Sequence, residues 1–440
     1  MRIKDDFFAL SSALNNKLAS EEVLLCTFYG EDSDFVRLNN NRIRQAGSVN
    51  QYEFGLQLIN GQRHCSGRCN ISGQQTIDLE RLSRLLESLR EQNQHSPEDA
   101  YLLYNTEPWN SGITSDNQLP DSQQIIEQLI ETAAGLDLVG IYASGTLYHG
   151  FANSLGQHNW QTHHQFNLDW SCYLSTDRAV KSQYVGSQWQ PGILEQKFDN
   201  IHQQLALLSK PSIALKPGDF RCYLSPTALS SILEIACWGG FGLKSHHTKN
   251  SPLIKLNEQN LALDTRIRIS ENNHDGFTPT FTEQGFITPD EVVLIDQGIR
   301  ADYLVSSRSA KEYNSVVNAQ SESPQSLQLS GGQLATADLL SAIDTGLYIS
   351  NLWYTNFSDC GNCRITGMTR FACFYIENGM IKAPIEVMRF DQSLYELLGD
   401  KLIDLSAETE CLASTDTYQH RSSSSMTLPG ILVDSFKLSF

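Results

Sequence analysis

The chain has 440 residues, of which 40% are hydrophobic and 19% are charged, a composition typical of a globular protein with more than one core. Its formal net charge of −18 disfavours binding to nucleic acid phosphates or to anionic lipid headgroups. The ten cysteines follow no regular spacing, which predicts reduced thiols in a cytoplasmic protein. Two aspartates interrupt the N-terminal region where a secretory signal needs an apolar run, and no segment is apolar enough to predict a membrane span.

Residues 1–95 are expected to form a first α+β segment. Apolar residues recur at helical spacing from Phe7 to Leu18, and residues 23–29 have the composition of a buried strand. Three further strands are expected at residues 36–45, 51–60 and 63–72. Asn60-Gly61 predicts a hairpin turn between the last two. Leucines from Leu79 to Leu89 then mark one face of an amphipathic helix.

Residues 96–210 are expected to form a second α+β segment of the same N-terminal region. The polar stretch 92–120 shows no sustained period and is a candidate linker between the two segments. The elements expected after it are a helix at Ile125–Ile130, a strand-rich meander at 138–176 with turns at Ser144-Gly145 and Ser154–Gly156, and a helix at Leu194–Leu208.

Residues 211–440 are expected to form a β-rich C-terminal domain, with the domain boundary at Lys210-Pro211 and Lys216-Pro217-Gly218, where proline and glycine disfavour regular structure. A strand at 220–224 is expected to lead into a helix that Ser225 caps and that Pro226 begins. Short strand-like segments make up most of the remainder. The fold class is therefore expected to be α+β, with helices and an antiparallel sheet in the N-terminal region and a β-rich C-terminal domain.

One CxxC pair, Cys360 and Cys363, has the spacing of a zinc chelate or a redox turn. A structural zinc site needs four ligands, no second CxxC is present, and strand-like sequence lies on both sides of the pair. Two unlinked thiols are therefore expected. The sequence also contains no complete phosphate loop, nucleophile elbow or H-E-x-x-H motif.

The other histidines and cysteines give no metal-binding pattern. His64, Cys65 and Cys69 lie along an expected strand, where neighbouring side chains point to opposite faces. The same divergence applies to the two adjacent histidine pairs, His163-His164 and His246-His247. We expect these histidines to be solvated or hydrogen-bonded rather than to bind a metal.

Five segments, taken in order and spacing, resemble the TldD/PmbA family, whose members are called modulators of DNA gyrase and are grouped with metallopeptidases. They are residues 151–157, 223–234, 282–310, 345–357 and 374–386. The resemblance spans most of the chain. It implies two N-terminal segments followed by a larger C-terminal domain.

TldD-type members carry an H-E-x-x-x-H motif on the helix that corresponds to residues 226–238, and a downstream cysteine completes a zinc site. Placed on this pattern, the sequence has Leu233 at the first histidine, retains Glu234 and has Trp238 at the second histidine. Leucine and tryptophan offer no lone pair to a metal, so Glu234 would have no metal-bound water to activate. Cys411 lies in the region of the family cysteine in a different sequence context, and its role as a remnant ligand stays open.

The resemblance therefore implies the PmbA (TldE-like) branch, in which a zinc-free chain helps to cleave small or unfolded peptides. The expected partners are a peptide and a second subunit, in a homodimer or in a heterodimer with a zinc-bearing TldD-type subunit. No cofactor is expected in this chain, and His246 and His247 are candidates for its peptide groove. Two alternatives remain, a protein-mediated regulator of DNA gyrase and an active hydrolase whose non-standard metal site combines these histidines with Glu234 and Cys411.

Overall fold

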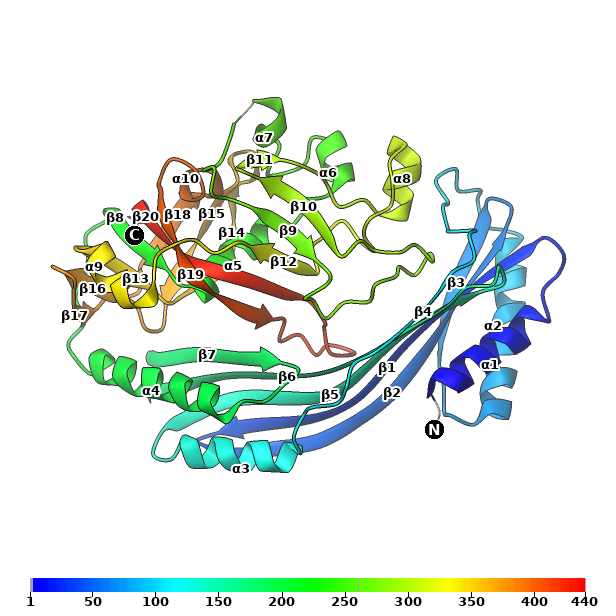
Figure 1. The fold of residues 1–440 in the computed structure, drawn as a ribbon, viewed down its shortest axis with the longest axis horizontal. Coiled ribbons are helices and arrows are strands. Elements are labelled where there is room, and N and C mark those ends of the chain that lie inside the picture. Colours follow the sequence, from blue (N-terminus) through cyan, green and yellow to red (C-terminus); the bar gives the residue numbers. More distant parts are fainter. Residues whose placement is uncertain (1–2, 260, 440) are drawn as a thin grey trace.

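The computed structural model describes residues 3–259 and 261–439, and two large sheets that face each other form its framework (Figure 1). The N-terminal half forms a curved sheet of seven strands, which lies beneath the C-terminal half in this view. Its strands are β1 (Glu22–Asn39), β2 (Arg42–Asn60), β3 (Arg63–Asn70), β4 (Asn110–Thr114), β5 (Asp137–Asn153), β6 (His158–Ser175) and β7 (Arg178–Gly186). Their order is β3-β2-β1-β5-β6-β4, with β7 also paired to β6.

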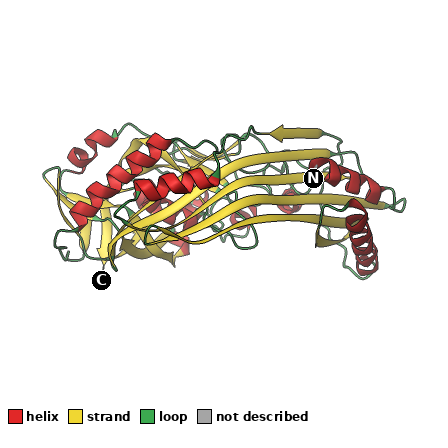
Figure 2. Ribbon diagram, turned by 90° about the horizontal axis from the view of Figure 1, so that it is seen from below, coloured by secondary structure: helices red, strands yellow, loops and turns green. Residues whose placement is uncertain are grey.

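Long helices cover the outer face of this sheet, which Figure 2 shows from below. They are α1 (Ile3–Asn15), α2 (Gln75–Asn93), α3 (Ser122–Thr132) and α4 (Pro191–Leu208). The ring of Phe7 on α1 lies 5.5 Å from Phe28 and 5.1 Å from Phe54, and Phe198 on α4 stacks on Trp170 at 5.6 Å. The apolar stripes of the helices thus meet even-numbered residues of β1, β2, β5, β6 and β7, and odd-numbered residues of β3.

In β1, β2, β5, β6 and β7, odd-numbered residues lie on the opposite, concave face, because successive side chains alternate across a strand. This concave face is directed toward the C-terminal half (Figure 1). Amide side chains recur along it, at Gln51, Gln57, Gln161, Gln165, Asn167 and Gln183. One face of the sheet is therefore apolar beneath helices, and the other is largely polar beneath the second half of the chain.

The C-terminal half forms a sheet of thirteen strands. Their bounds are β8 (Gly218–Leu224), β9 (Ile269–Asn272), β10 (Glu291–Asp296), β11 (Ile299–Arg300), β12 (Ser326–Leu329), β13 (Gly346–Ile349), β14 (Asn351–Asp359), β15 (Arg364–Arg370), β16 (Phe374–Glu377), β17 (Met380–Pro384), β18 (Arg389–Ser393), β19 (Leu402–Ala413) and β20 (Ser425–Ser439). The main path runs β11-β10-β9-β12-β20-β8-β13-β16-β17, and β19 is a further antiparallel partner of β20.

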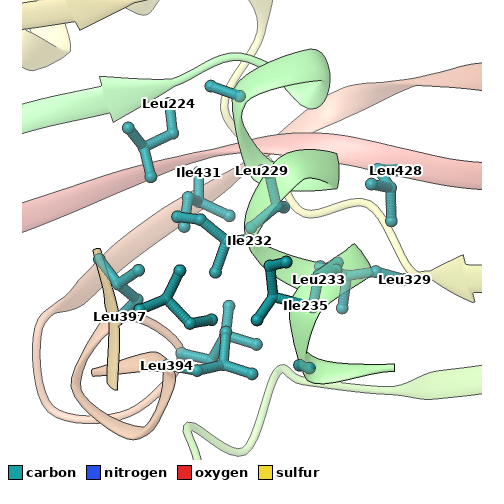
Figure 3. Close-up of a cluster of buried hydrophobic side chains, with 14 of the residues drawn as sticks. Leu224, Leu229, Ile232, Leu233, Ile235, Leu329, Leu394, Leu397, Leu428 and Ile431 are labelled. Atoms are coloured by element: carbon teal, nitrogen blue, oxygen red, sulfur yellow. The ribbon is translucent and has the colours of Figure 1, made fainter. Parts of the chain in front are cut away.

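Short helices complete the C-terminal half. They are α5 (Pro226–Ala236), α6 (Leu243–His247), α7 (Lys255–Glu258), α8 (Ser307–Tyr313), α9 (Leu339–Ile343) and α10 (Leu394–Leu397), with 3-10 turns at Thr336–Asp338 and Cys360–Asn362. The expected start of α5 is confirmed, because Ser225 Oγ accepts a hydrogen bond of 3.1 Å from the Ala228 N–H and Pro226 occupies the first turn. Figure 3 shows Leu229 and Ile232 directed into the buried cluster beneath α5.

The α+β fold class is confirmed, and so are two expected turns. Gly61 has a φ of +63° in the hairpin between β2 and β3, and Gly156 has a φ of +99° between β5 and β6. The strand expected at 36–45 is wrong. Asn40 and Asn41 have φ values of +50° and +51°, and they form the tight turn between β1 and β2, since asparagine tolerates the left-handed region.

The turn expected at Ser144-Gly145 is also wrong, because both residues lie inside β5. Gly145 has a φ of +149°, and a Cβ atom built on it would lie 2.0 Å from the carbonyl oxygen of Asp32 in β1. The glycine therefore permits a close approach of two strands in mid-sheet rather than a chain reversal.

The polar stretch 92–120 is not a free linker. It contains β4, which pairs in parallel with β6, and some of its other residues bond to the C-terminal half. The Trp109 indole donates a hydrogen bond of 2.8 Å to the Gly285 carbonyl, and Arg308 forms an ion pair with Asp99 at 2.6 Å.

The strands of residues 1–95 and 96–210 belong to one sheet, because β1 pairs with both β2 and β5. Among the residues described, no helix is both long and apolar enough to cross a membrane.

Candidate functional site

A cleft of about 600 Å³ lies between the concave face of the N-terminal sheet and the C-terminal half. The sheet contributes residues of β6 and β7, and the C-terminal half contributes α5, the chain around residues 323–325, and the adjoining ends of β19 and β20. Its charged and polar lining includes Asp169, Lys181, Gln183, Thr227, Ser230, Glu234 and Asp416. The cleft is therefore a polar space that both halves of the chain build.

The family motif positions on α5 point in different directions. Glu234 is exposed and lines the cleft, and Trp238, which follows the end of the helix, lines it too with 58% of its surface exposed. Leu233 is 0% exposed and packs in the hydrophobic cluster that Figure 3 shows. These side chains do not fit a zinc ion, since neither leucine nor tryptophan supplies a ligand atom.

Cys411 lies on β19, opposite Thr427 of β20, and burial raises the pKa of its thiol. Cys411 itself does not line the cleft, whereas Leu412 and Ala413 do. Within residues 3–259 and 261–439, no group of three or more His, Cys, Asp and Glu side chains is arranged to hold a metal ion.

His246 and His247 lie on α6, outside the lining of this cleft. The His246 ring stacks on Tyr303 with a centroid distance of 4.7 Å, and the His247 ring lies parallel to Tyr313 at 4.2 Å. Burial, and next the neighbouring His247, lower the pKa of His246. The structure therefore does not bring this pair together with Glu234 and Cys411, and their role in a peptide groove stays a prediction.

The remaining histidine and cysteine candidates have local partners. His64 lies 3.3 Å from Asp99, and His164 Nδ1 lies 2.9 Å from Thr146 Oγ1. Cys360 is exposed and Cys363 is buried, at either end of a 3-10 turn, and both are free thiols. Burial raises the pKa of each thiol, so neither has the low pKa of a reactive cysteine.

The loop between β19 and β20, residues Ser414–Ser424, projects from the C-terminal half onto the concave face, and Figure 1 shows it reaching down toward β6. We call this loop the finger. The Ser414 N–H donates to the Ser424 carbonyl at 2.9 Å and closes its base. Arg421 near the tip is only 4% exposed. A second cavity of about 370 Å³ lies beyond the finger, beside β1, β2 and β5.

Sequence reasoning missed the concave face and the finger. A usable signal was present in β6, where polar side chains occupy alternate positions from Gln161 to Asp169 on the face opposite Trp160 and Phe166. That alternation indicates a strand with one polar and one apolar face. The position of the finger on this face depends on contacts between residues more than 200 positions apart, for which the sequence offers no local signal.

Two ionisable groups at these cavities have shifted pKa values, the buried Glu271, which bonds to the lining residue Gln325, and the half-buried His149. Glu271 on β9 is 4% exposed and accepts hydrogen bonds from the backbone N–H groups of Gln325 and Ser326, and burial raises its pKa to about 7. His149 on β5 lines the second cavity, and burial lowers its pKa to about 3. At neutral pH His149 is therefore uncharged, and Glu271 keeps its proton to a higher pH than an exposed glutamate does.

Comparison with solved structures shows the fold of the whole chain. TldE from Thermococcus kodakarensis is 14% identical with a TM-score of 0.77, and the alignment covers 99% of this chain and 100% of that one. A candidate modulator of a DNA gyrase from Thermotoga maritima is also 14% identical, with a TM-score of 0.76 and coverage of 99% and 100%. A candidate DNA gyrase modulator from Bacteroides thetaiotaomicron is 16% identical, with a TM-score of 0.74 and coverage of 99% and 98%.

Sequence comparison gives the family. No curated protein matches the chain, but residues 217–439 match the family model of the PmbA/TldA metallopeptidase C-terminal domain. The matched region begins at the strand β8 that precedes α5 and continues to the end of β20, so it includes the whole C-terminal sheet. Because this match covers just over half of the sequence, the chain belongs to the TldD/PmbA family of metallopeptidase-related proteins.

Proposed function

We propose that this chain binds small or unfolded peptides as a non-catalytic, zinc-motif-less member of its family, and that it supports proteolysis without cleaving bonds itself. The observation that carries the proposal is that the two positions that correspond to the motif histidines, in and just after α5, hold residues that cannot bind zinc. Leu233, at the position of the first motif histidine, is 0% exposed in the core, and Trp238 takes the position of the second. A catalytic zinc needs about three protein ligands, and this helix offers none of its usual pair.

The cleft supports a peptide as the ligand. Its lining combines carboxylates, hydroxyls, amides and one lysine with the exposed indole of Trp238. Such a surface can hydrogen-bond a peptide main chain and pack against an apolar side chain at the same time. Its volume of about 600 Å³ suits a few residues of an extended chain rather than a folded domain.

The proposed partner is a zinc-bearing TldD-type subunit, with a homodimer of this chain as the other arrangement, and the proposed location is the cytoplasm. In the heterodimer, this chain would supply peptide-binding walls and the partner would supply the metal. The net charge of −18 gives no support for direct binding to DNA. A regulatory effect on DNA gyrase would therefore have to pass through protein contacts.

The test is to isolate the chain from its native cell, identify the proteins that accompany it, and measure bound metal and peptidase activity with and without them. We expect a partner that carries H-E-x-x-x-H, zinc in that partner, and hydrolysis of an unfolded substrate by the pair but not by this chain alone. Stoichiometric zinc and activity in the isolated chain would contradict the proposal and favour a hydrolase with a non-standard metal site.

Trp238→Ala provides a variant within the cleft, and Trp353→Ala provides its control, since Trp353 is also an exposed tryptophan and lies on β14 outside the cleft lining. We expect the first change to weaken binding of a fluorescent unfolded polypeptide by about tenfold, because a stacked aromatic contact contributes on the order of 1 kcal/mol or more. The second change should leave the affinity unaltered. Equal affinities for both variants would argue against the cleft as the peptide site.

A further inference from the structure

The finger, Ser414–Ser424, is held on the concave face through backbone carbonyl groups and through Arg421. At its base, Gln183 Nε2 donates to the Ala413 carbonyl at 2.8 Å and Asn167 Nδ2 donates to the Ser414 carbonyl at 3.0 Å. Near its tip, two other strands supply the donors. Gln51 Nε2 bonds the Gln419 carbonyl at 2.8 Å, and the Tyr29 hydroxyl bonds the Arg421 carbonyl at 3.2 Å.

These donors come from β7, β6, β2 and β1, so they form a path across the sheet. Each one is a neutral amide or hydroxyl group on the concave face. A carbonyl acceptor is present in every peptide unit, whatever the side chain. The path therefore recognises polypeptide backbone rather than a particular sequence, and the finger is the polypeptide that occupies it in this structure.

Arg421 provides the one buried side-chain anchor of the finger. Its guanidinium donates to Ser33 Oγ and to the Gln165 carbonyl, each at 3.1 Å, and its own N–H donates to Glu31 Oε2 at 3.2 Å. Gly145 lies between Ser33 and Gln165 in the strand register, and it carries no side chain. The guanidinium thus bridges β1 and β6 across β5, and it is attracted electrostatically to the buried carboxylate of Glu31.

Glu31 is 0% exposed, and its second oxygen, Oε1, has no hydrogen-bond partner among the described residues. Without the guanidinium nearby, this carboxylate would be left buried among neutral groups, which is unfavourable. Any polypeptide that replaces the finger is therefore favoured when it places a basic side chain at this point.

The finger also separates two cavities. The cleft of about 600 Å³ lies on one side and the cavity of about 370 Å³ on the other, and both are lined in part by Asp416 of the finger and by Gln325. With the finger withdrawn, the two would join into one groove along the concave face. A groove of that length can hold more of an extended chain than either cavity alone.

We propose that the concave face is a binding surface for the backbone of an extended peptide with a basic residue at the Arg421 site, and that the finger masks this surface until a peptide displaces it. The proposal rests on the proposed function, since it specifies how and where the peptide binds. It makes the finger an internal competitor of the ligand. Binding therefore measures the difference between the contacts of the peptide and those of the finger.

The first experiment removes the finger and returns it as a separate peptide. Residues 415–423 are replaced by Asn-Gly, because the bonded pair Ser414 and Ser424 already holds the two ends as a hairpin. A fluorescent peptide with the sequence of residues 414–424 is then titrated into the shortened and the full-length protein. We expect saturable binding to the shortened protein and at least tenfold weaker binding to the full-length one.

The same peptide with alanine at the Arg421 position should bind the shortened protein at least tenfold more weakly, because it leaves Glu31 without its basic neighbour. Absence of saturable binding by the unaltered peptide, or equal binding to the shortened and full-length proteins, would overturn the proposal.

A second variant tests the same point in the complete chain, in case the shortened protein does not fold. Arg421→Ala should raise hydrogen exchange at the amides of the finger and increase the affinity for the finger peptide. Arg84→Ala is the control, since Arg84 lies on the outer helix α2 with 72% of its side chain exposed. Unchanged exchange and affinity in Arg421→Ala would contradict the masking role.

An unfolded polypeptide, reduced and carboxymethylated casein, separates this proposal from the proposed function. Binding of the finger peptide to the shortened protein, with no binding or competition by casein, would support the masked surface and count against general peptide binding. Equal binding of casein to the full-length and shortened proteins would support peptide binding and overturn the masking. Tighter binding to the shortened protein is the result expected if both are correct.

Discussion

Leu233 and Glu234 are neighbours on α5, yet the first is completely buried in the C-terminal core and the second lines the cleft between the two halves of the chain. Side chains on adjacent helical positions lie about 100° apart, so a helix at the edge of a core divides them between packing and solvent. The family motif therefore survives here as one exposed carboxylate beside a structural leucine.

Truncation to alanine should have unequal effects on stability at Leu233 and Trp238, the two positions that correspond to the motif histidines. Leu233→Ala should lower the free energy of unfolding by about 2–4 kcal/mol, because it leaves a cavity beneath α5. Trp238→Ala should change it by less than about 1 kcal/mol, because Trp238 is 58% exposed. Urea titration followed by circular dichroism measures both, and a similar loss in the two variants would contradict the packing role of Leu233.

The backbone conformation of Gly145 leads us to expect that a side chain at this position would destabilise the N-terminal sheet. Gly145→Ala should destabilise the protein by about 2–4 kcal/mol, because φ is +149° and the new Cβ would meet the Asp32 carbonyl oxygen. Gly47→Ala on β2 is the control, since nothing lies within 4 Å of a Cβ atom at Gly47. Thermal unfolding of both variants gives the comparison, and equal melting temperatures would show that the strand approach is not strained.

Glu271 predicts a loss of stability as pH rises. Its pKa is raised from 4.5 to about 7 in the folded state, so the unfolded chain releases its proton first, and the contribution present below pH 4.5 is lost as pH rises toward 7. Glu271→Gln should remove this dependence and keep the hydrogen bonds from Gln325 and Ser326 to one oxygen. Unfolding titrations at pH 5 and pH 8 should show a smaller difference for the variant, and an unchanged difference would contradict the raised pKa.

The lowered pKa of His149 leads us to expect a loss of folding stability as pH falls. Its pKa is lowered from 6.5 to about 3, so the unfolded chain binds a proton first as pH falls below 6.5. The expected loss is about 2 kcal/mol between pH 6.5 and pH 5, from about 1.4 kcal/mol for each unit. His149→Phe should flatten this part of the stability profile, since His149 Nε2 has no hydrogen-bond partner among the described residues. A profile as steep as that of the parent protein would assign the loss to other groups.

Local signals in the sequence predicted the regular elements well. Ser225 and Pro226 fixed the start of α5, and the leucine spacing of 79–89 predicted α2, because capping and amphipathic periodicity act within one or two turns. The positions of turns were predicted wrongly where asparagine or glycine, which are common in turns, also occur in segments that look like strands. Asn40-Asn41 is a turn inside an expected strand, and Gly145 is part of a strand at an expected turn.

The site was predicted only in part. The position of Glu234 and the absence of both histidines follow from the sequence and its family pattern. To predict the concave face, one would have to know that β1, β5 and β6 pair. To predict the position of the finger, one would have to know contacts such as that of Arg421 with Glu31, which are 390 residues apart. Such pairings depend on the whole chain, so no local rule of composition or spacing predicts them.

Because Ser414 and Ser424 are hydrogen-bonded to each other, the number of residues in the finger can change without disturbing the pairing of the strands that carry it. Since this bond joins the two end residues of the finger, next to the last paired residues Ala413 and Ser425, residues between them can be gained or lost without altering the register of β19 and β20. Residues could thus be added to or removed from the finger of this chain while its core stays unchanged. If the finger masks the concave face as proposed, the length of this one connection sets how much of that face is open to a peptide.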